Sequence, residues 1–399
     1  MMQNTLTNHI FTKEEVLTEF IKIYGQNDSQ LRIFSSPARI NIIGEHIDYN
    51  GGKVFPSAID RYLFIAIRKR KDTKIIYNDI RFPGTYTFDI KDNFFYKKEN
   101  DYTNYLNGII KQLKEKKYIF ECGFECLIAS NIPAGGGISS SSALECGFAY
   151  AVKTLFNFNI ECQQIAELGQ MSEHNFMNVQ CGIMDQFIIA MAKKDTAILL
   201  DCNNLNYQYI PLNLKDCNFV VMNTNKVRRL QDSKYNERRS ECERSLKLLQ
   251  DAGFKINYLC ELKEEDFTKA EKILKEENLI KRTRHCITEN LRVKNAVEAL
   301  KENNLEKIGK LLCQSHLSLK NDYEVTGLEL DTLAFCAQKQ KGCLGARMTG
   351  AGFGGCAIAL VKKENTQSFI ENVQEEYAKT VGYKAGFFAC NSGDGVKEI

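Results

Sequence analysis

The sequence predicts an α+β protein with two domains. Its 399 residues are too many for one compact core and suit two domains of ordinary size. Apolar runs typical of strands predominate up to Ala129, whereas from Glu237 onward the chain is helical and charged. The polar stretch 202–206 predicts a turn near the boundary. We therefore expect an N-terminal domain over residues 1–205 and a C-terminal domain over residues 206–399.

The first elements follow from capping and strand patterns. Thr12 and Glu15 form a capping-box pattern, and Gly25 can end the helix that they begin. Short apolar runs then predict strands at 31–34, 40–43, 63–68 and 74–77.

The middle of the chain has the order strand, glycine loop, helix. The strand is expected over 121–129 and the helix over 143–156. Further helices are predicted at 162–178, 238–251 and, in three stretches, up to about Leu319. A strand at 196–201 lies between them, and the chain ends with a strand at 356–361, a helix at 366–379 and a strand near 385–389.

Bulk properties exclude several classes of function. Lys plus Arg total 53 against 50 Asp plus Glu, so the net charge of +3 gives no reason to invoke nucleic acid or a membrane surface. No apolar run approaches the roughly 20 residues of a membrane span, and residues 1–11 lack the core of a signal peptide. The 15 cysteines are odd in number and include no C-x-x-C pair, which predicts reduced thiols. We expect a cytoplasmic protein.

The loop before the 143–156 helix has the composition of a phosphate cradle. Gly135 to Gly137 let backbone N–H groups converge, and Ser139 to Ser142 are of the type that begins helices, so the positive end of a helix would face an anion. The Walker, dinucleotide and nucleophile-elbow spacings are absent from it. Glycines alone would equally predict a flexible connector.

Two further groups of residues carry possible chemistry. Glu45, His46 and Asp48 follow an apolar strand and suit a polyhydroxylated ligand, although a solvated turn is the alternative. Asp185 lies among apolar residues, so it is either a helix cap or a buried functional carboxylate. Glu173 lies at the border of an apolar helix stripe and can point into a cleft or into solvent.

Three motifs of this chain resemble those of the galactokinases of the GHMP small-molecule kinase superfamily. Residues 37–50 resemble the galactokinase signature, residues 133–143 the superfamily's ATP-binding motif and residues 345–355 its C-terminal glycine motif. The third motif contains G-x-G-x-x-G but leads into a strand, so it is no dinucleotide fingerprint. The resemblance implies the two-domain GHMP kinase fold, with mixed sheets flanked by helices and the active site in the cleft between the domains.

The resemblance also implies an activity, the ATP-dependent phosphorylation of D-galactose at the C1 hydroxyl. The products would be galactose 1-phosphate and ADP, in galactose catabolism by the Leloir pathway. Asp185 would take the proton of the anomeric hydroxyl, and Arg39 would hold that carboxylate ionised and offset charge on the phosphoryl group. Whether Asp185 is a true base or mainly an electrostatic group stays open, because phosphoryl transfer has a loose transition state.

The remaining roles are carried over from the resemblance position by position. The implied sugar-binding residues are Glu45, His46, Asp48, the backbone at Gly182, and Tyr235. The residues expected to wrap the ATP phosphates are Gly135, Gly136, Gly137, Ile138, Ser139, Ser140 and Ser141. Mg²⁺ would be held by Ser141 and Glu173 together with water and phosphate oxygens. The adenine pocket has no motif that can be transferred.

One position departs from the family, and two other functions stay open. Ala38 stands where glycine is usual, which would strain the backbone only at a positive φ. N-acetylgalactosamine kinase shares the Arg, Asp and Mg²⁺ machinery and differs in room around C2 of the sugar. A non-catalytic sensor of galactose and ATP is the other alternative, which the intact Arg39, Glu173 and Asp185 argue against. We expect a monomer with galactose and ATP as its small-molecule partners.

Overall fold

The computed structural model describes residues 11–133, 137–226 and 231–399. The α-helices are α1 (Lys13–Tyr24), α2 (Thr103–Glu115), α3 (Ser140–Phe156), α4 (Cys162–Asn175), α5 (Met184–Met191), α6 (Gln231–Asp251), α7 (Phe267–Leu274), α8 (Glu277–Lys301), α9 (Leu305–Asn321), α10 (Leu328–Gln338) and α11 (Thr366–Val381). The strands are β1 (Arg32–Ile43), β2 (Lys53–Lys69), β3 (Lys74–Asp79), β4 (Phe82–Asp89), β5 (Phe124–Ser130), β6 (Thr196–Asp201), β7 (Tyr207–Pro211), β8 (Cys217–Asn223), β9 (Cys343–Thr349), β10 (Cys356–Lys362), β11 (Gly386–Cys390) and β12 (Lys397–Glu398). Short 3₁₀ turns are η2 (Asp48–Asn50), η3 (Lys98–Asn100), η4 (Leu259–Glu261), η5 (Glu264–Asp266) and η6 (Lys363–Asn365).

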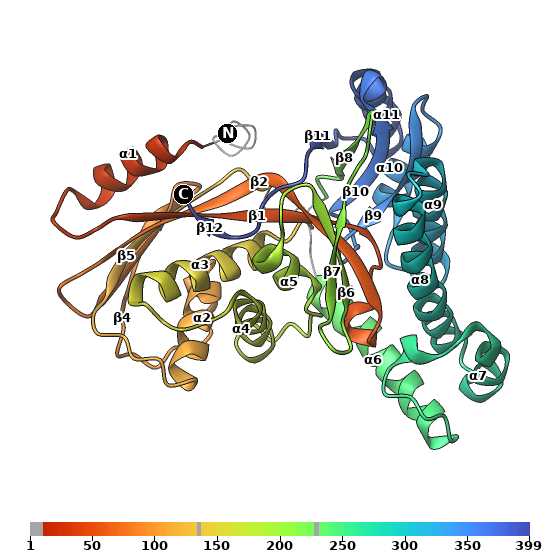
Figure 1. The fold of residues 1–399 in the computed structure, drawn as a ribbon, viewed down its shortest axis with the longest axis horizontal. Coiled ribbons are helices and arrows are strands. Elements are labelled where there is room, and N and C mark those ends of the chain that lie inside the picture. Colours follow the sequence, from red (N-terminus) through yellow and green to blue (C-terminus); the bar gives the residue numbers. More distant parts are fainter. Residues whose placement is uncertain (1–10, 134–136, 227–230) are drawn as a thin grey trace.

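The larger sheet forms the first layer of the molecule. Within the described residues it has eight strands in the order β12-β1-β2-β5-β3-β4, with β6 paired to β2 and β7 to β6. Of the strand pairs described in this sheet, only that of β3 and β5 is parallel. Helix α1 lies on one face, and α2 to α5 lie together on the other (Figure 1). Antiparallel meanders with helices on their faces are typical of an α+β fold.

The smaller sheet has the order β11-β8-β10-β9, and each of its pairs is antiparallel. Helices α9 and α10 pack against β9, and α11 packs against α10 and β10. Figure 1 shows this sheet and its helices beside the end of β1 and the beginning of β2. The end of β1 contacts β9 directly, so residues that follow β1 lie at the junction of the two sheets.

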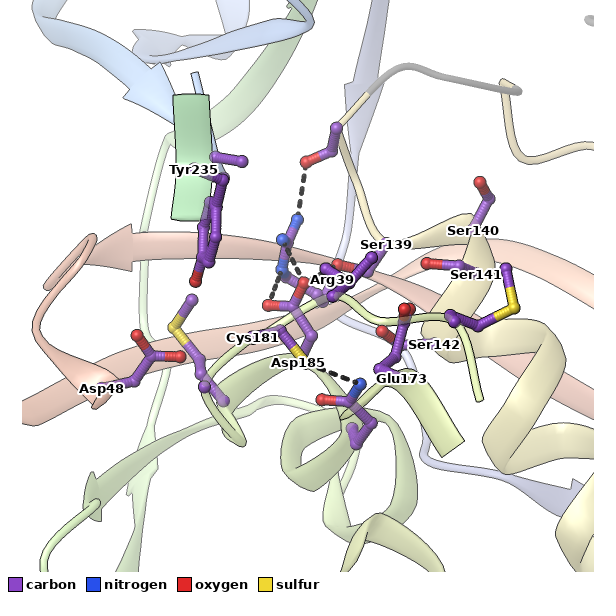
Figure 2. A pocket seen from close by; sticks show the side chains of 18 of the residues that line it. Arg39, Asp48, Ser139, Ser140, Ser141, Ser142, Glu173, Cys181, Asp185 and Tyr235 are labelled. Atoms are coloured by element: carbon purple, nitrogen blue, oxygen red, sulfur yellow. Dashed lines mark hydrogen bonds and ion pairs between the residues drawn. The ribbon is translucent and has the colours of Figure 1, made fainter. Parts of the chain in front are cut away.

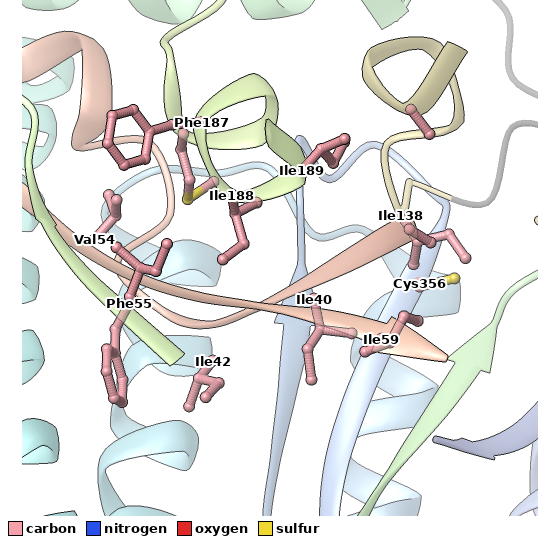
Figure 3. Packing of buried hydrophobic residues seen from close by; sticks show 14 of the residues in the cluster. Ile40, Ile42, Val54, Phe55, Ile59, Ile138, Phe187, Ile188, Ile189 and Cys356 are labelled. Carbon is pink, nitrogen blue, oxygen red and sulfur yellow. The ribbon is translucent and has the colours of Figure 1, made fainter. Parts of the chain in front are cut away.

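A shared apolar core joins the two parts. One cluster of buried side chains runs from the large sheet through α5 to the small sheet. Figure 3 shows Ile40 and Ile59 of the large sheet, Ile188 of α5 and Cys356 at the start of β10 within that cluster. Ile138, in the loop before α3, also enters it with a fully buried side chain. The glycine loop is therefore anchored in the core at Ile138.

Most of the expected elements are confirmed, and their ends differ for identifiable reasons. Helix α1 has Thr12 as its N-cap residue, with the full capping box, and Gly25 with φ 72° as its C-cap residue. The two short strands expected around Pro37 are one strand, β1, because a register shift at Pro37 and Ala38 lets the ladder continue past the proline. The patterns gave no indication of α2, α5, α10, β4, β7, β8, β9 and β12. Of these, β4 and β7 are mostly exposed, whereas α2 and β8 are largely buried.

The proposed division at residues 205 and 206 stays a prediction. Strand β7 pairs with β6, and β12 pairs with β1, so two strands from beyond residue 205 belong to the larger sheet. All fifteen cysteines are free thiols. None of the helices in the described part of the chain combines the length and apolar character needed to cross a membrane.

A pair of glycines sets the distance between α9 and β9, which leads to a stability prediction. A Cβ atom at Gly309 would overlap the backbone carbonyl of Leu344, and one at Gly345 would overlap that of Gly309. Backbone atoms cannot turn away as a side chain can. We expect Gly309→Ala to lower the free energy of unfolding by about 1–3 kcal/mol.

Urea unfolding followed by circular dichroism checks this value. Lys310→Ala, at the next and exposed position of α9, is the control and should change the free energy by less than about 0.5 kcal/mol. Equal stability of Gly309→Ala and the wild type would contradict the close packing of α9 on β9.

Candidate active site

An ion pair between Arg39 and Asp185 lies at the centre of the site. Arg39, on β1, donates from Nε to Asp185 Oδ1 over 2.8 Å and from Nη2 to Oδ2 over 2.6 Å. Its Nη1 donates to the carbonyl oxygen of Gly137 over 2.8 Å. The Arg39 side chain is 4% exposed, whereas the Asp185 side chain is 27% exposed. The arginine is thus a fixed support, and the carboxylate on the first turn of α5 is reachable from the cleft.

Ser139 connects the glycine loop to this pair. It is the N-cap residue of α3 and has the left-handed angles φ 61° and ψ 47°. Its side chain does not cap the helix but donates a hydrogen bond to Asp185 Oδ2. At this position the serine therefore does not have the capping role that the sequence predicted. The hydroxyl of Ser139 therefore leaves the first amides of α3 uncapped, and among the described residues the positive end of the helix is available to an anion.

These residues line one cavity of about 470 Å³. Its lining residues include Arg39, Glu45, His46, Asp48, Gly137, Ser139, Ser140, Ser141, Glu173, Gly182, Asp185 and Tyr235. Figure 2 shows Tyr235 and Asp48 on one side of the central pair and Ser140, Ser141 and Glu173 on the other. The cavity therefore has a polar aromatic end and a serine-rich end, with the Asp185 carboxylate between them.

Asp48 and Gly182 approach each other closely at the aromatic end. A Cβ atom at Gly182 would overlap the carboxylate of Asp48, so a larger residue at this position would displace that carboxylate. Burial and the nearby Asp185 raise the pKa of Asp48 to about 6, against backbone hydrogen bonds from Tyr49 and Met184 that favour the charged form. The site thus holds two carboxylates near each other at a cost in stability.

Glu45 is held from several directions. It accepts from Asn41 Nδ2 over 2.8 Å and from the backbone N–H of Gly350 over 3.0 Å, and it forms a close ion pair with Arg347 of β9. Glu45 is 1% exposed and Arg347 is fully buried. Burial raises the pKa of Glu45 to about 7, although the Arg347 guanidinium favours its charged form.

His46 follows with an unusual backbone and a fully engaged ring. Its φ is 61°, in the left-handed region. The ring contacts Tyr49 Oη through Nδ1 at 2.8 Å and the carbonyl oxygen of Ala351 through Nε2 at 3.1 Å. Burial lowers the pKa of His46 to about 3, so the ring is neutral near pH 7. Its face packs on Tyr235 with ring centroids 5.5 Å apart.

The serine-rich end offers oxygen ligands that suit Mg²⁺. Ser141 on α3 and the buried Glu173 on α4 both line the cavity, and Figure 2 shows both side chains beside the first turn of α3. One carboxylate and one hydroxyl, completed by phosphate oxygens and water, is a donor set that Mg²⁺ accepts. Glu145 of α3 lies fully buried near Glu173, and burial together with Glu173 raises the pKa of Glu145 well above its usual range.

The structure brings together the residues that the sequence assigned to the sugar, the metal and the reaction. Of the phosphate-loop residues, Gly137, Ser139, Ser140 and Ser141 line the cavity, while the side chain of Ile138 points into the core. Gly135 and Gly136 lie outside the described residues. Ala38 has no positive φ and is fully buried in β1, so alanine is harmless at this position.

Sequence reasoning missed two groups of residues. Tyr96, Tyr105, Met177 and Val179 line the cavity but belong to no motif. Arg347 was part of the glycine motif without an assigned role. A charged residue inside the apolar strand 345–348 needs a buried partner, and this signal could have identified it.

Comparison with known proteins first shows the class of protein to which this chain belongs. Three family models match this chain: the galactokinase galactose-binding signature over residues 18–69, the GHMP kinase N-terminal domain over residues 104–193 and the GHMP kinase C-terminal domain over residues 296–379. A mevalonate kinase from Methanococcus jannaschii has the same fold, with a TM-score of 0.65 at 22% identity over 92% of this chain and all of that one. The fold and the site define a GHMP kinase.

Relatives at higher identity give the family. The galactokinase of Clostridium tetani is 47% identical over 96% of this chain and 97% of its own length, and one from Clostridium perfringens is 49% identical over 95% and 98%. The crystal structure of Lactococcus lactis galactokinase complexed with galactose superposes with a TM-score of 0.93 at 44% identity, covering 97% of this chain and 100% of that one. The chain belongs to the galactokinase family.

The raised pKa of Asp48 predicts a gain in stability when its charge is removed. Its folded pKa of about 6 lies above the ordinary 3.8, so ionisation destabilises the folded state increasingly from about pH 4 to pH 6 and fully above that. We expect Asp48→Asn to unfold at a higher temperature than the wild type at pH 8, with a gain of at most about 3 kcal/mol.

Thermal unfolding at several pH values tests the origin of this gain. The advantage of Asp48→Asn should shrink below about pH 6 and vanish near pH 4, because both proteins are then uncharged at this position. Asp201→Asn, which removes a carboxylate paired with Lys53 outside the cavity, is the control and should show no such gain. A variant that is less stable than the wild type at pH 8 would contradict this description of Asp48.

Proposed function

We propose that the protein transfers the terminal phosphoryl group of ATP to the C1 hydroxyl of D-galactose, giving galactose 1-phosphate and ADP. The observation that carries the proposal is the carboxylate of Asp185, held by Arg39 and Ser139 between a polar aromatic pocket and the positive end of α3. A sugar hydroxyl bound at the aromatic end and a phosphate bound at the serine-rich end would meet beside this carboxylate. Membership of the galactokinase family supports this choice of substrate.

Hydrogen-bond counting indicates which oxygen of Asp185 meets the substrate. Oδ2 accepts from Arg39 Nη2 and from the Ser139 hydroxyl, which use both of its lone pairs. Oδ1 accepts only from Arg39 Nε among these groups. Oδ1 therefore keeps a lone pair for the C1 hydroxyl of the sugar, and we assign it as the proton acceptor.

The reaction then follows from charge and position. The C1 oxygen attacks the γ-phosphorus while its proton passes to Asp185 Oδ1, and the bond between the γ-phosphorus and the β,γ-bridging oxygen breaks to release ADP. Arg39 neutralises the carboxylate and lies where charge develops on the phosphoryl group. The first amides of α3 receive phosphate oxygens, as the positive end of a helix does.

The other roles in the cleft are proposals of the same kind. Asp48, with the backbone at Gly182 and the ring of Tyr235, would bind sugar hydroxyls, and Glu45 and His46 would shape the wall behind them. Mg²⁺ held by Ser141 and Glu173 would offset the charge of the ATP phosphates. Tyr96, Tyr105 and Met177 would contact the nucleotide beyond its phosphates. A monomeric state and a cytoplasmic location stay predictions from the sequence.

Removing the carboxylate of Asp185 should lower turnover strongly while the site still binds galactose. Asp185→Ala and the isosteric Asp185→Asn are expected to lower kcat by about 100-fold to 10,000-fold, the usual contribution of a positioned base. Asparagine keeps the size of the side chain, so galactose affinity should change much less than kcat.

Coupled ADP release with galactose measures this effect, with calorimetry for galactose binding. Asp201→Asn serves as the control carboxylate and should turn over at the wild-type rate. Turnover of Asp185→Asn within about tenfold of the wild type would exclude Asp185 as the base and leave positioning by Arg39 and the α3 amides as the source of catalysis.

A further inference from the structure

A continuous chain of hydrogen-bonding groups lies behind the aromatic end of the cavity. Cys242 Sγ of α6 lies 3.1 Å from Tyr323 Oη, which follows α9, and Tyr323 Oη lies 2.9 Å from Tyr49 Oη in η2. Tyr49 Oη lies 2.8 Å from His46 Nδ1, and His46 Nε2 lies 3.1 Å from the carbonyl oxygen of Ala351. Segments far apart in the sequence are thus joined through one imidazole ring.

The direction of every hydrogen bond in this chain follows from counting protons. A carbonyl oxygen only accepts, so His46 Nε2 must carry the proton that it shares with Ala351. The ring is neutral because burial lowers the pKa of His46 to about 3, so Nδ1 has no proton and accepts from the Tyr49 hydroxyl. Tyr49 has one hydroxyl hydrogen, so Tyr323 must donate to Tyr49, and the Cys242 thiol must donate to Tyr323.

We propose that Tyr49 is a positioning residue that fixes His46 as the tautomer with its proton on Nε2, and that Tyr323 and Cys242 continue the same chain of hydrogen bonds behind it. The opposite tautomer would set the lone pair of Nε2 against the carbonyl oxygen of Ala351. The rings of Tyr323, Tyr235 and Tyr49 pack around His46 at centroid distances of 4.7, 5.5 and 6.0 Å and hold the imidazole in this position.

The fixed tautomer has a consequence for the site, which rests on the proposed function. His46 presents one N–H donor to the cavity wall and has no acceptor left for a sugar hydroxyl. The same N–H holds Ala351, whose neighbour Gly350 donates to Glu45. A Cβ atom at Gly350 would lie 2.5 Å from the carbonyl oxygen of Gly137 and 3.4 Å from Arg39 Nη2. The tautomer of His46 therefore supports the loop that packs against the catalytic arginine.

Nitrogen NMR of protein labelled with ¹⁵N-histidine tests the tautomer in the absence of sugar and nucleotide. The chain has five histidines, and the resonances of His46 are assigned as those missing from His46→Gln. We expect wild-type His46 to show a protonated Nε2 and an unprotonated, hydrogen-bonded Nδ1. In Tyr49→Phe, which lacks the donor to Nδ1, we expect altered shifts of both nitrogens and a mixture of tautomers.

Two matched variants separate this role from general damage to the fold. Tyr323→Phe keeps the Tyr49 hydroxyl, so His46 should keep its tautomer. Tyr77→Phe removes a buried hydroxyl of β3 that has no hydrogen-bond partner among the described residues, and both NMR and turnover should be unchanged. In steady-state assays, Tyr49→Phe should lower kcat/KM for galactose by about tenfold and change the KM for ATP by less than about twofold.

Two results would overturn the proposal. One is a wild-type His46 that carries its proton on Nδ1, which can be seen even if Tyr49→Phe does not fold. The other is a Tyr49→Phe protein whose His46 nitrogens keep their wild-type shifts. Failure of the proposed function is distinct, because a wild-type protein without galactose-dependent ADP release would still report the tautomer of His46.

Discussion

The buried ion pair between Glu45 and Arg347 connects the two sheets at the site. Glu45 follows β1 of the large sheet, and Arg347 lies in β9 of the small one. Two charges removed from water are expensive, and their attraction compensates only when the remaining hydrogen-bonding capacity is also used. Here Asn41 and Gly350 donate to Glu45, and Arg347 Nη1 donates to the carbonyl oxygens of Asn41 and Ile42 over 3.1 Å. Most of this capacity is therefore used, although Arg347 Nε has no hydrogen-bond partner among the described residues. Each of the two charged side chains thus obtains its ion-pair partner and some of its hydrogen bonds from the other sheet.

This coupling explains how motifs far apart in the sequence make one cavity. The glycine motif that carries Arg347 also places Gly350 against Gly137 and Arg39, and Ala351 against His46. Arg39 in turn holds Asp185 and the glycine loop before α3. The position of the Asp185 carboxylate therefore depends on a chain of contacts that begins at the buried pair. The pKa of Asp48 is raised because Asp48 is buried and places a further negative charge near Asp185.

Much of the fold and site could be predicted because each motif carries a local physical signal. The capping box at Thr12, the apolar run of β6 and the polar group Glu45, His46 and Asp48 have properties that can be interpreted from sequence. The side-chain role of Ser139 could not be predicted, because its left-handed backbone turns the hydroxyl away from the helix toward Asp185. The continuity of β1 past Pro37 depends on its partner β2, which no local pattern records.

Residues without motifs were the hardest to predict. Tyr96 and Met177 reach the cavity only through the packing of loops around α2 and α4, and Tyr49, Tyr323 and Cys242 meet only in the folded chain. The hydrogen-bond partners of such residues are nonlocal, so spacing along the sequence carries no information about them. Arg347 is the exception, since a charge inside an apolar strand predicts a buried partner even though it does not identify Glu45.

A double-mutant cycle on Glu45 and Arg347 tests the central role of the buried pair most directly. The measurement is the free energy of unfolding in urea of the wild type, Glu45→Gln, Arg347→Met and the double variant. Each single change leaves a buried group without its partner and should cost about 3–5 kcal/mol, while the double variant should cost less than their sum by about 2 kcal/mol or more. Costs that add to within about 0.5 kcal/mol would contradict the coupling of the two sheets through this pair.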